Sequence, residues 1–113
     1  MAKDSGFHEY VMNEVLREIP GVTSRPMFGD WGIYQGGLFF ALIADARLYF
    51  KVGETNKADY ESAGSEPFVY KGRDGKAMTM AYWELPAEVI DNPTQVRSWV
   101  EKSVEVARKA KKR

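Results

Sequence analysis

Cysteine is absent from the 113 residues, and histidine occurs once, as His8. Without cysteine the chain has no disulfide, no thiolate nucleophile and no Cys-based zinc or iron–sulfur site. His8 falls in the first turn of an expected helix with no other ligand type nearby in the sequence, so an exposed helical histidine explains it best. The sequence therefore indicates neither a metal site nor a bound cofactor.

Long apolar runs are also missing. No stretch of about 20 apolar residues that could cross a membrane occurs, and residues 1–6 lack the apolar core of a signal peptide. We expect a cytoplasmic protein without membrane contact. The length fits one compact domain, which we place at residues 1–107, followed by a basic C-terminal tail at residues 108–113.

Charge of neither sign dominates, since 16 Lys and Arg residues balance 16 Asp and Glu residues. Five of the basic residues lie in the last six positions, so residues 1–107 keep 11 basic against 16 acidic side chains. An acidic body is a poor general surface for nucleic acid. The tail alone could contact phosphates, and the simpler alternative is that its cations stabilise the C-terminus of the last helix.

Residue types that could build an active site are scattered along the chain. Asp30, Asp45 and Asp74 all fall at expected turns, where aspartate is favoured because its side chain bonds the local backbone. The glycines between positions 29 and 37 lead into strands without a Gly-Lys-Ser/Thr triplet, so a phosphate-binding loop is not indicated. No spacing singles out a pair of carboxylates for acid–base catalysis. We therefore predict that the protein is not an enzyme.

The spacing of apolar residues predicts helices at both ends of the chain and strands between them. Residues 24–29 form an extended, turn-rich lead into the first strand, because the residue before a proline avoids helical angles. We expect Thr55 to cap a short helix that Gly64 closes. Asn92 should cap the last helix, with Pro93 in its first turn. The predicted helices cover residues 7–19, 56–63 and 93 onward, and the predicted strands cover 31–35, 38–44, 47–52, 67–72 and 76–83.

The order of these elements is α-βββ-α-ββ-α. It predicts an α+β fold, a twisted antiparallel sheet of about five strands with the helices packed on one side. The first helix should bury Met12, Val15, Leu16 and Ile19. In the last helix the buried stripe should consist of Val96, Trp99, Val100, Ser103, Val104 and Ala107.

Aromatic residues make up 13% of the chain and concentrate on the predicted strands, where basic residues accompany them. A period of two places Leu48 and Phe50 on one face of their strand and Tyr49 and Lys51 on the other. An aromatic and basic sheet face can hold a partner chain or stack nucleic-acid bases. The same composition is also ordinary for a half-exposed sheet. The residues alone leave these alternatives open.

Several short motifs follow one another along nearly the whole chain. They are Arg25-Pro26-Met27-Phe28-Gly29, Gly32-Ile33-Tyr34, Phe40-Ala41-Leu42-Ile43-Ala44-Asp45, Leu48-Tyr49-Phe50-Lys51, Gly64-Ser65-Glu66-Pro67-Phe68-Val69-Tyr70 and Met80-Ala81-Tyr82-Trp83-Glu84-Leu85-Pro86. Together and in this order they resemble the N-terminal domain of the TfoX/Sxy competence regulators. The resemblance implies a secretion-chaperone-like α+β fold and a bacterial, cytoplasmic protein linked to the regulation of DNA-uptake genes.

TfoX-type proteins act together with the cyclic-AMP receptor protein, so the resemblance implies a protein partner from the transcription machinery. It supplies no catalytic residue, and a fold does not fix a function. We therefore expect a non-enzymatic binding or regulatory domain that acts through protein–protein contact. The expected contact surface consists of Arg25, Met27, Phe28, Tyr34, Tyr49, Lys51, Tyr70 and Tyr82.

The alternative is weak nucleic-acid binding, which would use the aromatic and basic sheet face together with the tail. The tail residues that could contact phosphates are Arg108, Lys109, Lys111, Lys112 and Arg113. An edge strand left open by two separate groups of strands could also pair with a second copy, so a homodimer is a further expectation.

Overall fold

The computed structural model describes residues 5–27, 30–71 and 77–111. The turn that we predicted at Asp74-Gly75 lies outside the described residues. The elements in chain order are α1 (Ser5–Tyr10), the π-helical turn η1 (Val11–Val15), β1 (Val22–Met27), β2 (Asp30–Gln35), β3 (Leu38–Ala44), β4 (Arg47–Lys51), α2 (Lys57–Ser62), β5 (Pro67–Lys71), β6 (Ala77–Glu84), α3 (Ala87–Ile90) and α4 (Pro93–Lys111).

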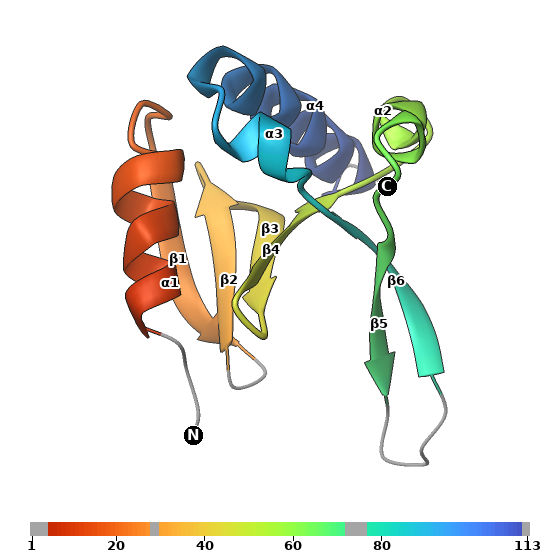
Figure 1. Cartoon of the computed structure of the whole chain (residues 1–113), viewed down its shortest axis with the longest axis horizontal. Coiled ribbons are helices and arrows are strands. Elements are labelled where there is room, and N and C mark those ends of the chain that lie inside the picture. Colours follow the sequence, from red (N-terminus) through yellow and green to blue (C-terminus); the bar gives the residue numbers. More distant parts are fainter. Residues whose placement is uncertain (1–4, 28–29, 72–76, 112–113) are drawn as a thin grey trace.

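The strands form an open antiparallel sheet in the order β1-β2-β3-β4-β6-β5, which confirms the predicted α+β class. Two-residue turns at Gly36-Gly37 and Asp45-Ala46 join neighbouring strands, so β2, β3 and β4 form a meander. β6 then pairs with β4 and leaves β5 at the free edge. The β5–β6 hairpin consequently extends away from α4, toward the bottom of Figure 1.

The sheet has six strands where the sequence predicted about five. The additional strand is β1, which the sequence analysis treated as an extended lead. β1 pairs along its whole length with β2, from Val22 opposite Gln35 to Met27 opposite Asp30. Pro26 cannot donate a backbone hydrogen bond, and it is tolerated because β1 lies at the edge of the sheet.

The N-terminal helix is shorter and less regular than predicted. α1 ends at Tyr10 and passes into η1, where the Leu16 amide donates to the Val11 carbonyl at 2.9 Å across five residues. This wider turn brings Val11, Leu16 and Ile19 into the core. Met12 and Val15, which a regular helix would have buried, are only half-buried. The prediction of one regular helix over 7–19 is therefore wrong.

The short helix α2 begins one residue later than predicted, and Thr55 does not cap it. The neighbouring Asn56 is buried instead. Its Oδ1 accepts a hydrogen bond from the Gly53 amide at 2.8 Å, and its Nδ2 donates to the Lys51 carbonyl at 3.1 Å. Asn56 thus fastens the end of β4 to the loop before α2. Gly64 closes the helix with a φ of +75°, as predicted.

The last helix matches its prediction closely. The Gln95 amide donates to Asn92 Oδ1 at 3.2 Å, so Asn92 caps α4 as expected. The predicted stripe is buried except for Trp99, which is half-buried against Tyr60. α4 therefore presents one apolar side to the sheet.

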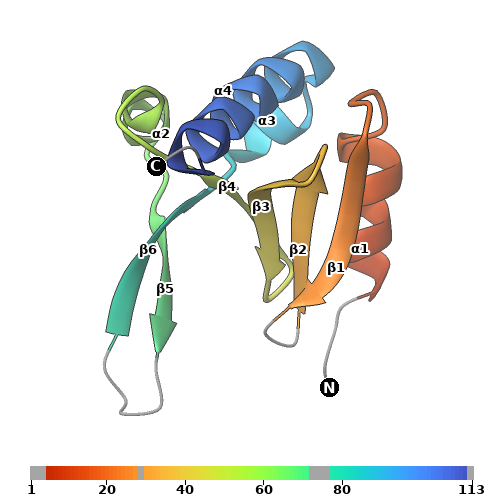
Figure 2. The same ribbon diagram turned by 180° about the vertical axis from the view of Figure 1, so that it is seen from behind.

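The core lies between the helices and one face of the sheet. Val11 and Leu16 from the N-terminal segment and Val96, Val100 and Val104 from α4 pack in one cluster with buried sheet residues. The sheet contributes chiefly Ile33, Phe40, Ile43, Leu48 and Phe50. The N-terminal segment and α4 thus pack on the same side of the sheet, as predicted. Figure 2 shows the strands from the side opposite to α1. None of the helices in the described ranges is both long and apolar enough to span a membrane.

Candidate functional site

The two faces of β4 have opposite characters. Leu48 and Phe50 point into the core, at 2% and 0% exposure. Tyr49 and Lys51 lie on the other face and are half-buried. This alternation is the one that a period of two predicts from the sequence. The face that carries Tyr49 and Lys51 is the candidate site.

Strand pairing extends this face across the sheet. Arg25 pairs with Gly32, Gly32 with Leu42, and Leu42 with Tyr49, so these residues share one side of the sheet. Lys51 pairs with Tyr82 on β6 in the same way. We call the resulting surface the outer face. It consists of Arg25, Met27, Tyr34, Phe39, Leu42, Tyr49, Lys51, Phe68 and Tyr82.

Aromatic rings on the outer face touch one another across strands. The ring centroids of Tyr34 and Phe39 are 5.1 Å apart, and those of Phe39 and Tyr82 are 5.3 Å apart. Nearer the β5–β6 hairpin, Tyr49 meets Phe68 edge-on at 5.0 Å. Such pairs are worth about 0.5–1.5 kcal/mol each beyond the burial of their area. The contacts hold the rings in defined orientations while most of them stay partly exposed.

Glycine at position 32 allows the rings to come close to the sheet. A Cβ at this position would lie 2.9 Å from Met27 Cε and 3.2 Å from Phe39 Cε1. Met27 and Phe39 therefore close over the backbone of Gly32. The close approach of these two side chains, and not the backbone conformation, distinguishes this glycine, because its φ is not in the left-handed region.

Two cations accompany the rings. The Arg25 guanidinium carbon lies 5.3 Å from the Tyr34 ring centroid, and Lys51 Nζ lies 5.0 Å from that of Tyr82. Burial lowers the pKa of Lys51 below its ordinary value. Burial also raises the pKa of Tyr82 and, helped by the negative charge of Glu84, that of Tyr49. Both tyrosines stay protonated and keep a hydroxyl donor at neutral pH.

The structure brings most of the predicted contact residues together. Six of the eight lie on the outer face: Arg25, Met27, Tyr34, Tyr49, Lys51 and Tyr82. Tyr82 is only 5% exposed, so it supports this surface more than it offers area for contact. Phe28 lies outside the described residues, as does the side chain of Tyr70.

The sequence analysis missed Phe39, Leu42 and Phe68. A strict period of two would place Phe39 with Ala41 and Ile43 on the core face. A bulge between β2 and β3 shifts the register at Ile33/Tyr34 and brings Phe39 opposite Tyr34 instead. A second irregularity lies at Pro67/Val69, beside Phe68. Nothing in the local sequence signals either bulge.

The described basic residues of the predicted tail belong to α4. Arg108, Lys109 and Lys111 lie in its last turns and are exposed. Arg108 forms an ion pair with Glu105, one helical turn earlier. Lys112 and Arg113 lie outside the described residues.

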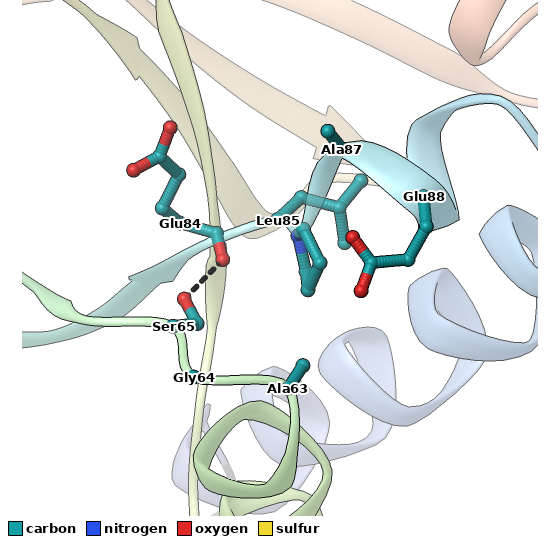
Figure 3. A pocket seen from close by; sticks show the side chains of 8 residues that line it. Ala63, Gly64, Ser65, Glu84, Leu85, Ala87 and Glu88 are labelled. Atoms are coloured by element: carbon teal, nitrogen blue, oxygen red, sulfur yellow. Dashed lines mark hydrogen bonds between the residues drawn. The ribbon is translucent and has the colours of Figure 1, made fainter.

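Two acidic residues border an open pocket of about 250 Å³ beside α2 and α3. They are Glu84 and Glu88, and Figure 3 shows the carboxylate of Glu84 turned away from that of Glu88. Glu84 Oε1 instead pairs with Arg47 Nη1 at 3.2 Å. Glu84 and Glu88 therefore lack the convergent geometry of an acid–base couple. Within the described ranges no three His, Asp or Glu side chains cluster as a metal site requires.

Comparison with known proteins agrees with this architecture. The family model of the TfoX N-terminal domain matches residues 14–107, a range that runs from η1 through most of α4. The chain is also 27% identical over 93 residues to the DNA transformation protein TfoX1 of Aliivibrio fischeri. That match covers 82% of this chain and 44% of the relative, so the chain spans less than half of the relative's length. The chain belongs to the TfoX N-terminal domain family.

Proposed function

We propose that this domain is a non-catalytic binding module that takes part in the regulation of competence through protein–protein contact. The observation that carries the proposal is the outer face, where ordered and partly exposed rings lie on a sheet surface opposite the helical core. Family membership supports the link to competence, as does the name of the relative, a DNA transformation protein.

The physical properties of the outer face favour a protein as the partner. Aromatic and arginine side chains contribute most of the binding energy in protein interfaces. Tyr34 and Tyr49 already have ring neighbours that fix their orientation, so binding costs them little conformational entropy. As partner we propose a protein of the transcription machinery, such as a cyclic-AMP receptor protein.

Substitution of Tyr49 tests this proposal. Tyr49→Ala should abolish natural transformation of the host and capture of the purified receptor protein, while it lowers the free energy of unfolding by no more than about 1–2 kcal/mol. Tyr10→Ala is the matched control, because Tyr10 is 42% exposed and lies on α1, away from the outer face. Wild-type transformation with Tyr49→Ala would contradict the proposal, and a large loss of stability would make Tyr49 structural.

Nucleic-acid binding is the second candidate function. It is favoured by Lys111, which lines a groove together with Lys51 and two aromatic rings of the outer face. Deleting residues 108–113 should then weaken binding of a DNA duplex. The salt dependence of binding should become less steep by about 0.9 in the logarithmic slope for each phosphate that the tail no longer neutralises. Unchanged binding after the deletion would exclude the tail from this role.

A further inference from the structure

The outer face ends in a groove of about 340 Å³ beside the C-terminal turns of α4. Phe39, Lys51 and Tyr82 form its sheet side, and Gly37 and Leu38 border it where β3 begins. Ala107, Ala110 and Lys111 form the helix side. In both Figure 1 and Figure 2 the end of α4 lies next to β4 and β6.

The lining of this groove has one sign of charge. Its charged members are Lys51 and Lys111, and the other lining residues are apolar, aromatic or glycine. Lys51 Nζ forms no ion pair with any described residue, although it is half-buried over the Tyr82 ring. A partly desolvated ammonium without a counterion favours an anion as its partner.

The space around Lys51 selects the kind of anion. Phe39, Ala107 and Ala110 line the groove together with Lys51 and give it an apolar wall. A nucleic-acid strand needs a continuous track of cations, whereas the nearby Arg108 is already paired with Glu105. A short acidic side chain flanked by an apolar one matches both the charge and the wall.

We infer that this groove binds an acidic side chain of the partner protein, with an adjacent apolar side chain of the same segment packed against Phe39, Ala107 and Ala110. The inference rests on the proposed function, and it names the chemistry that the partner must present. Lys51 supplies the charged contact, and Tyr82 beneath it holds the ammonium in place. Lys111, which is exposed, adds attraction at the rim.

Selection from a display library of random linear peptides tests this inference without knowledge of the natural partner. Peptides that bind the full chain should be enriched in Asp or Glu next to an apolar residue. Lys51→Met should weaken their binding by at least about tenfold, because it removes a charge-assisted hydrogen bond. Lys109→Met removes the same charge from the same end of α4 outside the groove lining, and it should leave binding unchanged.

A second pair of variants leaves Lys51 in place. Ala110→Glu introduces a carboxylate at the exposed helix side of the groove, so it should neutralise Lys51 and prevent peptide binding. Ala110→Gln adds nearly the same volume without charge and should bind the peptides far better. Equal binding by both variants overturns the inference.

Further outcomes would overturn the inference that the groove binds an acidic side chain. Selected peptides without acidic enrichment, an absence of binders, or equal affinity for Lys51→Met each overturn the inference. An oligo-deoxythymidine probe that binds in a Lys51-dependent manner while peptides do not would assign the groove to nucleic acid and also overturn it. Loss of transformation in Tyr49→Ala would still uphold the proposed function, so the two failures are distinguishable.

Discussion

Ala46 adopts a backbone conformation that alanine rarely takes. The β3–β4 turn places Asp45 and Ala46 in the left-handed region, with φ values of 52° and 57°. Such geometry suits a two-residue hairpin and costs a residue with a Cβ roughly 1–2 kcal/mol. An aspartate tolerates this region better, because its side chain can bond locally, whereas alanine has no such compensation.

Ala46→Gly should therefore stabilise the protein. We expect the free energy of unfolding to rise by about 0.5–1 kcal/mol, which is the relieved strain less the added entropy of the unfolded chain. Urea denaturation followed by circular dichroism measures the change. Ala44→Gly, in the extended part of β3, is the control and should destabilise. A lower stability for Ala46→Gly would contradict the role assigned to the turn geometry.

Asn56 is a buried polar residue whose side chain has a structural role. Replacing it by alanine leaves the Gly53 amide and one acceptor site of the Lys51 carbonyl without their partner. Asn56→Ala should lower the free energy of unfolding by about 1–3 kcal/mol. Thr55→Ala, at the exposed position that the sequence suggested as the cap, should change stability little. A larger effect at Thr55 than at Asn56 would contradict the observed hydrogen bonds.

At the scale of elements, α1 is attached to the sheet through its histidine. The His8 ring stacks on Trp31 with centroids 3.7 Å apart, and His8 Nε2 lies 2.8 Å from Ser24 Oγ. Burial lowers the pKa of His8 below its ordinary value of 6.5, and the charge of Glu9 opposes this shift. His8 is thus part of the contact between α1 and the first two strands, although its sequence context suggested only an exposed helical residue.

Acidification should weaken this attachment. As the pH falls through 6.5, the unfolded chain takes up the His8 proton before the folded protein does, so stability falls below that pH. Urea unfolding about one pH unit above and about one pH unit below the ordinary pKa of histidine measures this loss of unfolding free energy. His8→Phe preserves an aromatic stack without the proton and should lose less stability over the same interval. An equal loss in both proteins would contradict the assignment.

At the scale of the whole molecule, the two faces of the sheet differ: one packs in the core, and the outer face, which we propose for partner binding, is partly exposed. Phe50 is fully buried and packs edge-on against Phe40, with centroids 5.5 Å apart. The adjacent Tyr49 lies on the outer face and meets the ring of Phe68 edge-on. Neighbouring positions on β4 should therefore respond differently to truncation.

Phe50→Ala should cost about 3–5 kcal/mol, a large part of the roughly 5–15 kcal/mol that stabilises a typical domain. Tyr49→Ala should cost no more than about 1–2 kcal/mol, because it removes a partly exposed ring and one edge-on contact. Calorimetry of both variants separates the two faces. A loss of stability at Tyr49 as great as that at Phe50 would show that the outer face belongs to the core.

Much of this division follows from the sequence, because it depends on short-range rules. The alternation of Leu48, Tyr49, Phe50 and Lys51 assigns each side chain to a face, and Asn92 caps α4 through its neighbouring amides. These features need no knowledge of distant segments. The order of the elements other than β1, η1 and α3 follows in the same way, as does the aromatic and basic character of one face.

Only the tertiary structure decided how these pieces meet. β1 becomes a strand because β2 offers it a partner, and the π-helical turn η1 lets Val11 reach the core. A bulge that depends on the pairing of β2 with β3 moves Phe39 onto the outer face, and the end of α4 turns that face into a groove. Strand register and helix placement are set by contacts between residues far apart in the chain, which local spacing does not encode.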